Sequence, residues 1–491
     1  MSRAAGQFTL HPDRLFPADP ATRAIARELY AGVARLPIIS PHGHTDPAWF
    51  ADNQPFADPA TLFVIPDHYV HRMLYSQGIR PEQVGVPRLD GDPVETDKRK
   101  IWRILAENFH LYRGTPSYLW LTHAFQTVFG IAEVPSKDNA DRLYDTIEAA
   151  LKRPEFRPRA LFERFNIEEI ATTESPLDDL RHHRKIRQSG WKGRVVTAFR
   201  PDAVVDPAIP GFADNLEALG RLTGKDTTTY RGYLAALADR RRYFVEVGGA
   251  TSTDHGHPTA RTADLQAEDA AALYARVRTG GASTEEAELF RAQMLTEMAA
   301  MSTVDGLVMQ IHPGARRDHN PEIFRTFGKD KGADIPGPTG YVEELRPLLA
   351  RFGNRADLTI ILFTLDETVY ARELAPLAGH YPALKLGPAW WFHDSPEGMR
   401  RYREQMTETA GFYNTVGFND DTRAFLSIPA RHDVARRVDS AFLARMVAEH
   451  RMDLCEAEAL IVDLTYNLPK KAYKLDQRPD WARPAALRAA E

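Results

Sequence analysis

The stretch that decides the predicted fold is Leu36-Pro37-Ile38-Ile39-Ser40-Pro41-His42-Gly43-His44. Its short apolar run is typical of a buried strand, and the run ends in two histidines one residue apart. Because side chains at positions i and i+2 of a strand point to the same face, we expect His42 and His44 to project together. Two imidazoles held by one rigid segment can bind a divalent metal with little loss of entropy. The alternative is that one histidine caps a turn while the other packs in the core.

Length and composition indicate a globular enzyme. The chain has 491 residues, of which 43% are hydrophobic and 26% charged, enough for one large barrel with insertions or for two to three domains. The net charge of −5 shows no basic excess that would indicate a nucleic-acid partner. The single cysteine, Cys455, excludes an internal disulfide and fits a reducing compartment. Without a secretion core or an apolar window of ~20 residues, we expect a cytoplasmic protein with no membrane partner.

The rest of the chain predicts alternating strands and helices. Residues 1–35 are expected to form an N-terminal helical segment, and residues 36–491 a barrel with a helical insertion at about 59–151. With the strand before His42, eight strands alternate with helices, which indicates a parallel sheet closed into a (β/α)8 TIM-like barrel. A doubly wound open sheet is the alternative, but no glycine-rich phosphate motif follows any strand. The other predicted strands are residues 167–173, 194–199, 243–248, 306–312, 358–363, 383–386 and 413–418. We expect the tail from Pro479 to be peripheral.

Polar residues follow most of these strands, where the active site of such a barrel lies. A carboxylate after the eighth strand, Asp420 or Asp421, would complete a three-ligand site with the histidine pair. That donor set suits a catalytic zinc or a related divalent ion. His312, after the fifth strand, is either a further ligand or a substrate contact. Taken singly, each polar residue is also explained by helix capping or surface pairing.

In their order along the chain, these residues resemble the uronate isomerase (glucuronate isomerase) family of the amidohydrolase superfamily over nearly the whole length. The motifs that carry the resemblance are His42-Gly43-His44, Asp67-His68-Tyr69 with Arg72, Thr172-Thr173 with Pro176 and Asp178, His182-His183, Arg200-Pro201-Asp202, Ser252-Thr253-Asp254-His255-Gly256, His312-Pro313-Gly314-Ala315, Gly387 with Trp390-Trp391-Phe392, and Asp421-Thr422-Arg423-Ala424-Phe425.

The resemblance implies a divalent metal, zinc in our prediction, held by His42, His44 and Asp421, with His312 near it. It also implies that His68, Tyr69 and Arg423 contact the substrate and belong to the catalytic group. Further substrate-binding residues are expected at His312, Arg200, Asp254 and Trp391. The partners expected are a small uronate substrate and, in a homo-oligomer, further copies of the chain.

The family converts D-glucuronate to D-fructuronate and D-galacturonate to D-tagaturonate, moving a proton from C2 to C1 through an enediol. Asp421 is our candidate for the base. Tyr69, a phenol expected to have a lowered pKa beside cations, would move a proton between the two oxygens. A guanidinium binds a carboxylate bidentately, so Arg423 is favoured for the uronate carboxylate over Arg200 and Arg316.

Two other functions compete with this interpretation. A mononuclear metal-dependent hydrolase would use the same metal to generate hydroxide. A binuclear hydrolase of the superfamily is disfavoured, since the predicted sixth strand ends in Phe363-Thr364-Leu365-Asp366, which contains no histidine. A non-catalytic sugar-binding protein would need neither the base nor the phenol. In that case Tyr69 would be a core aromatic residue whose hydroxyl binds a backbone carbonyl.

Overall fold

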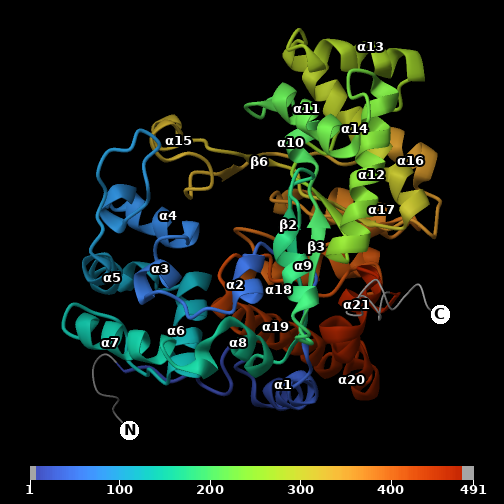
Figure 1. The fold of residues 1–491 in the computed structure, drawn as a ribbon. Helices are drawn as coiled ribbons and strands as arrows, with labels where there is room; N and C mark the ends of the chain where they lie inside the picture. Colours follow the sequence, from blue (N-terminus) through green and yellow to red (C-terminus); the bar gives the residue numbers. More distant parts are fainter. Residues whose placement is uncertain (1–6, 478–491) are drawn as a thin grey trace.

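The computed structural model describes residues 7–477, so the predicted tail from Pro479 lies outside them (Figure 1). Within this range, one seven-stranded parallel sheet curls around the centre of the molecule. The strands follow one another in chain order, as expected for a barrel of repeated strand–helix units. In sheet order they are β1 (Ile38–Ser40), β2 (Ile167–Glu174), β3 (Arg194–Phe199), β4 (Ser252–His255), β5 (Val308–Ile311), β8 (Ile360–Leu362) and β9 (Leu384–Leu386).

The segment of residues 414–422 completes the ring between β9 and β1. On one side, Leu386 N donates to Asn414 O at 2.8 Å and Val416 N donates to Leu386 O at 3.0 Å. On the other side, His44 N donates to Thr422 O at 3.1 Å. The predicted TIM-like barrel class is therefore confirmed. The eighth strand predicted over residues 413–418 is wrong in detail, since the segment forms only an isolated parallel bridge from Thr415.

The fourth predicted strand is also wrong. Residues 243–248 form the last turns of helix α12 (Tyr230–Gly248), and the strand lies later, at Ser252–His255. The aromatic and β-branched run looks like a strand locally, but it continues the buried face of the helix, with Phe244 in the core. Gly249 ends the helix in the left-handed conformation at φ 68°, which allows the chain to turn into β4. The shift places Asp254 and His255 within the strand itself.

Helices cover the outside of the sheet. The N-terminal helix α1 (Pro20–Val33) packs against α19 and α20 through Leu29 and Val33 (Figure 1). The helices that follow β2 and the later strands are α9 (Arg181–Gln188), α10 (Asp202–Val205), α11 (Phe212–Thr223), α12, α13 (Ala267–Arg278), α14 (Thr284–Asp305), α16 (Arg346–Phe352), α17 (Ala375–Ala378), α18 (Pro396–Ala410), α19 (Ile428–Ala448), α20 (Leu454–Val462) and α21 (Leu468–Ala472). In the part of the chain described, no helix combines the length and the apolar character needed to cross a membrane.

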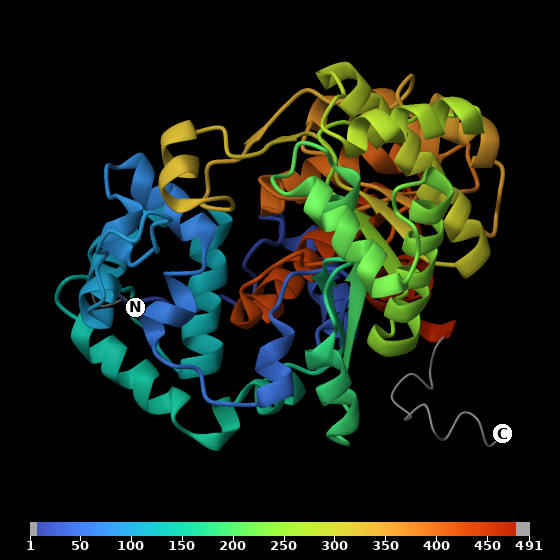
Figure 2. The same ribbon diagram turned by 45° about the horizontal axis from the view of Figure 1, so that its top comes forward.

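Between β1 and β2 the chain forms a helical layer beside the barrel (Figures 1 and 2). Its buried aromatic residues, Trp102, Phe109 and Phe125 among them, form a core shared with the start of β2. The division of the chain into an N-terminal segment and a barrel with its insertion stays a prediction. The helices of this layer are α2 (Pro47–Asp52), α3 (Pro59–Phe63), α4 (His68–Ser76), α5 (Lys98–Glu107), α6 (Pro116–Phe129), α7 (Ala140–Leu151) and α8 (Pro158–Arg164).

A crossing segment, residues 315–336, extends from the barrel to the helical layer (Figure 1). It contains β6 (Ala315–Arg316), β7 (Ile335–Pro336) and, between them, α15 (Pro321–Phe327). Ile323 and Phe327 are buried in the core of the helical layer, and Leu89 N donates to Thr326 O at 2.8 Å. The crossing segment therefore fixes the two parts of the molecule on either side of the barrel mouth, and the sequence analysis did not predict it.

Candidate active site

A cavity of about 1000 Å³ lies at the carboxyl ends of the strands, between the barrel, the helical layer and the crossing segment. Such a position is where a parallel barrel holds its active site. Every residue that the sequence assigned to the site lines this cavity, although these residues come from both ends of the chain. They are His42, His44, His68, Tyr69, Arg200, Asp254, His312, Trp391, Asp421 and Arg423.

The histidine pair after β1 meets Asp421 after the last strand-like segment. Asp421 Oδ1 lies 3.5 Å from His42 Nε2 and 3.2 Å from His44 Nε2. One ligating atom from each residue falls within 4.8 Å of the others. Two imidazoles and a carboxylate at this spacing are a donor set for a divalent metal ion with coordination positions left open.

The surroundings of Asp421 fit that interpretation. Its Oδ1 is buried and accepts no hydrogen bond from the described residues, whereas Oδ2 accepts one from Trp390 Nε1 at 2.5 Å. Asp421 adopts a left-handed backbone conformation with φ 37°, an uncommon state for a non-glycine residue. Burial raises the pKa of Asp421, but the imidazoles of His42 and His44 outweigh burial and hold that pKa below its usual value. The carboxylate is thus ionised and available as a ligand or a base.

The neighbouring carboxylate, Asp420, has a different role. Its Oδ2 forms a hydrogen bond with His432 Nε2 at 3.0 Å, and both side chains are buried. Asp420 therefore anchors the loop to α19, and Asp421 is the carboxylate that lies beside His42 and His44. The sequence alone left this choice between adjacent residues open.

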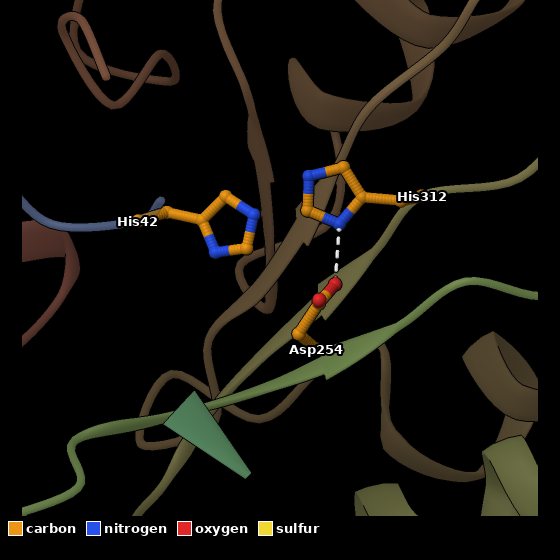
Figure 3. Close-up of side chains that lie close together, drawn as sticks. All are labelled: His42, Asp254 and His312. Atoms are coloured by element: carbon orange, nitrogen blue, oxygen red, sulfur yellow. Dashed lines mark hydrogen bonds and ion pairs between the residues drawn. The ribbon is translucent and has the colours of Figure 1, made fainter. Parts of the chain in front are cut away.

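A second cluster joins His42 to His312 and Asp254 (Figure 3). His312 Nδ1 and Asp254 Oδ1 share a hydrogen bond of 2.8 Å, which orients the imidazole, while His312 Nε2 finds no partner among the described residues. The His312 ring stacks on Phe363, with ring centroids 3.9 Å apart, and on His42, with centroids 4.8 Å apart. The unpartnered nitrogen suits both roles predicted for His312, metal ligand and substrate contact.

Asp254 and Arg200 lie behind His312. Arg200 Nη1 donates to Asp254 Oδ2 at 3.0 Å, and Arg200 Nε donates to Asp202 Oδ2 at 2.8 Å. Burial raises the pKa of Asp254, yet the Arg200 guanidinium and His312 hold it well below its usual value. The carboxylate therefore stays charged and orients His312, while Arg200 is already engaged by two carboxylates. This arrangement favours support of His312 over direct binding of a substrate carboxylate.

His68 and Tyr69 enter the cavity from the first turn of α4, which Asp67 caps by accepting from Tyr69 N at 2.8 Å. The Tyr69 hydroxyl donates to Asp394 Oδ2 at 3.3 Å. Burial raises the pKa of Tyr69 well above its usual value, so the expected lowering by nearby cations is wrong. Burial also lowers the pKa of His68 to about 3, which leaves the imidazole neutral.

Arg423 lies at the opening of the cavity with 42% of its side chain exposed. Its Nη2 donates to Asp330 Oδ2 of the crossing segment at 2.9 Å. Trp391 lies nearby on the cavity wall, edge-on to His68 at 5.6 Å between ring centroids. Since Asp330 engages a single guanidinium nitrogen, Arg423 can still offer donors to a second carboxylate.

Sequence reasoning missed three residues at the site. Trp390 belongs to the tryptophan motif of the resemblance but was given no site role, and its Nε1 donates to Asp421 Oδ2. Asp394 and Arg431 form an ion pair of 2.7 Å next to Tyr69. The sequence does contain Asp394 three residues after the tryptophan pair, but Arg431 lies within the helix α19, and nothing in its local pattern marks it.

Glu174, also on the cavity wall, makes stability depend on pH. Burial raises its pKa from 4.5 to about 8, against hydrogen bonds from Thr197 and Thr172. Below pH 4.5 the folded and unfolded chains both carry the proton, and as the pH rises toward about 8 only the unfolded chain releases it. This contribution to stability is therefore lost with rising pH.

We expect Glu174→Gln, which cannot ionise, to reduce the fall in melting temperature between about pH 5 and pH 8 relative to the wild-type chain. The exposed Glu217→Gln is the control and should follow the wild-type curve. Parallel curves for wild type and Glu174→Gln would contradict the assignment.

Comparisons with known proteins agree with one another. The family model described as glucuronate isomerase matches residues 20–473. The chain is 64% identical to the uronate isomerase of Caulobacter vibrioides (strain NA1000 / CB15N) over 486 residues, covering 99% of both chains. It is 66% identical over 471 residues to the uronate isomerase of Rhizorhabdus wittichii, covering 96% of this chain and 100% of that relative. The crystal structure of glucuronate isomerase from Caulobacter crescentus matches with a TM-score of 0.95 at 64% identity, covering 97% of this chain and 99% of that one.

Proposed function

The chain belongs to the glucuronate isomerase family, and we propose that it interconverts a 6-carboxy aldose and the corresponding 2-ketose. The reactions are D-glucuronate to D-fructuronate and D-galacturonate to D-tagaturonate. The observation that supports assigning this function to particular residues is that His42, His44 and Asp421 lie close together. They line the same cavity as Tyr69 and Arg423. Family membership decides between the isomerase and the hydrolase that the sequence left as an alternative.

His42, His44 and Asp421 would hold the metal ion, with His312 as a further ligand or a contact to the sugar. The orphaned Asp421 Oδ1 and the all-nitrogen-and-oxygen donor set fit zinc, the ion that we propose. When bound, the ion supplies positive charge that orients and polarises the oxygens of the open-chain sugar.

The protein groups perform the proton transfers. Asp421 removes the proton from C2 of the aldose while the Tyr69 hydroxyl gives its proton to O1, which forms the enediol. Asp421 then returns a proton to C1 while the Tyr69 phenolate takes the proton from O2, which leaves the ketone at C2. Since burial keeps the pKa of Tyr69 high, its hydroxyl begins the cycle protonated and acts first as the donor.

Binding of the uronate carboxylate is assigned to Arg423, whose guanidinium offers donors at the cavity opening. His68, which is neutral, lies between Tyr69 and Trp391 and contacts the sugar chain in this proposal. Arg200 and Asp254 act through His312, and Trp391 forms part of the wall against which the sugar packs.

The test is to incubate the protein, loaded with zinc, with each uronate in D₂O. We expect formation of the ketose and incorporation of deuterium at C1, because the base exchanges its proton with solvent. The absence of turnover with both uronates, after reconstitution with zinc and other divalent ions, would overturn the proposal. Assays with amide, ester and lactone substrates would then test the hydrolase function.

Arg423→Met is expected to raise the KM for D-glucuronate by roughly 10- to 100-fold, the value of one or two lost charge-assisted hydrogen bonds. The effect on kcat should be smaller, since the carboxylate lies away from the reacting carbons. Arg401→Met is the matched control, because Arg401 is similarly exposed and paired with Glu367 on the surface. An unchanged KM for Arg423→Met would assign the uronate carboxylate to another cation.

We also propose that the protein is cytoplasmic and assembles as a homo-oligomer. The single exposed cysteine, Cys455, supports a reducing compartment, since the chain needs no disulfide. Sedimentation velocity over a range of concentrations measures the assembly state, and a monomer at all concentrations would contradict the second proposal.

A further inference from the structure

Asp394, in the loop before α18, is a buried carboxylate to which the proposed mechanism gives no task. The residue is 8% exposed and lines the cavity. Asp394 Oδ2 accepts the Tyr69 hydroxyl at 3.3 Å, while Oδ1 has no hydrogen-bond partner among residues 7–477. A carboxylate that served packing alone would be expected to have both oxygens satisfied by the protein, because an unpaired buried acceptor is costly.

Arg431 of α19 fixes Asp394 from the other side. Its Nη1 donates to Asp394 Oδ2 at 2.7 Å, and the residue is 3% exposed. The guanidinium carbon lies 3.5 Å from the ring centroid of Trp120, and the same Nη1 donates to the carbonyl oxygen of Asp420 at 3.2 Å. Arg431 is thus held between an aromatic face and the loop that carries Asp421.

These contacts connect Tyr69 and Asp421, the two proton-transfer groups, whose relative positions the mechanism requires to be fixed. Tyr69 comes from the helical layer and Asp421 from the closing segment of the barrel, and no element of secondary structure includes both. The chain of contacts Tyr69–Asp394–Arg431–Asp420 spans the distance through buried polar groups. Since proton transfer requires the donor to lie within hydrogen-bond reach of its acceptor, a small displacement of the phenol would slow the reaction.

We propose that Asp394 is a positioning residue that holds the Tyr69 hydroxyl for proton transfer, with Arg431 fixing Asp394 relative to the Asp420–Asp421 loop. This inference rests on the proposed isomerase function and on the role of Tyr69 in it. It adds to that function two residues that act through others and have no part in metal binding.

A double-mutant cycle of Asp394→Ala and Tyr69→Phe tests the proposal. Asp394→Ala is expected to lower kcat for D-glucuronate about 10-fold or more, with KM within about threefold of wild type and the metal content unchanged. In the Tyr69→Phe background the same substitution should change kcat by less than about threefold, because its partner is already absent. Losses that multiply in the double variant would overturn the proposal.

A conservative variant and a matched control separate positioning from general damage. Asp394→Asn keeps an acceptor for the hydroxyl and should recover part of the kcat lost in Asp394→Ala. Asp439→Ala breaks a comparably buried pair with Arg403, with contacts of 2.7 and 2.9 Å away from the cavity, and should lower the melting temperature with little change in kcat. An equal loss of kcat in Asp439→Ala and Asp394→Ala would overturn the proposal.

Thermal unfolding of the wild type, the two single variants and the double variant tests the hydrogen bond between Tyr69 and Asp394 without an activity assay. We expect the effects of Tyr69→Phe and Asp394→Ala on the free energy of unfolding to be non-additive, since the two groups share a hydrogen bond. Strictly additive effects would overturn the positioning role even if the wild-type protein isomerised neither uronate. That inactivity would instead count against the proposed function.

Discussion

Replacing Asp421 with asparagine is expected to lower kcat for both uronates by roughly 10³-fold or more while leaving the fold intact. Among residues 7–477, Asp421 is the one acidic residue that forms a candidate ligand group with both His42 and His44. It is also our candidate for the base. An amide of the same shape still accepts the hydrogen bond from Trp390, but it cannot remove a proton from carbon. The expected loss is therefore chemical, and the melting temperature should change little.

The measurement has to separate loss of the base from loss of the metal. We would determine metal content by elemental analysis and measure kcat after reconstitution with excess zinc. Asp420→Asn is the matched control, since Asp420 is the adjacent residue, is buried and pairs with His432. Asp420→Asn should affect stability more than turnover. Near-normal turnover of metal-loaded Asp421→Asn would place the base elsewhere.

Replacing His42 with alanine is expected to remove most of the bound metal and, with it, most of the activity. Outer-shell substitutions alone commonly weaken metal binding 10- to 100-fold, so loss of a direct ligand should cost at least about that much. His42 is 1% exposed and belongs to both candidate ligand groups, which makes it the histidine with the largest expected effect. Excess metal should restore only part of the turnover.

His183→Ala is the control for this experiment. His183 is equally buried, but it bonds Thr172 behind β2 and does not line the cavity. Its replacement should lower stability without changing the metal stoichiometry. An unchanged metal-to-protein ratio in His42→Ala would show that His42 is not a ligand. It would exclude His42 from both candidate ligand groups.

Local sequence patterns predicted the elements well where one signal dominated. The apolar periodicity of residues 98–109 and 118–129 predicts two helices, and the structure has them at Lys98–Glu107 and Pro116–Phe129. The run of residues 243–248 shows the limit of such reasoning, because its aromatic and β-branched side chains fit a strand and the buried face of a helix equally well. Packing against the sheet decided the outcome. The crossing segment, with strands of two residues, leaves no periodic signal to detect.

The sequence by itself determined which residue types were available at the strand ends, and with the family resemblance it determined the reaction. The histidine pair shows why this was possible, because a His-Gly-His at the end of a strand presents both imidazoles on one face wherever the strand lies. Only the tertiary structure decided which carboxylate faces that pair, which arginines are already engaged by acids, and that the pKa of Tyr69 is raised. The physical reason is that burial and contacts between residues far apart in the chain set the charge and orientation of each group, and neither is encoded in local spacing.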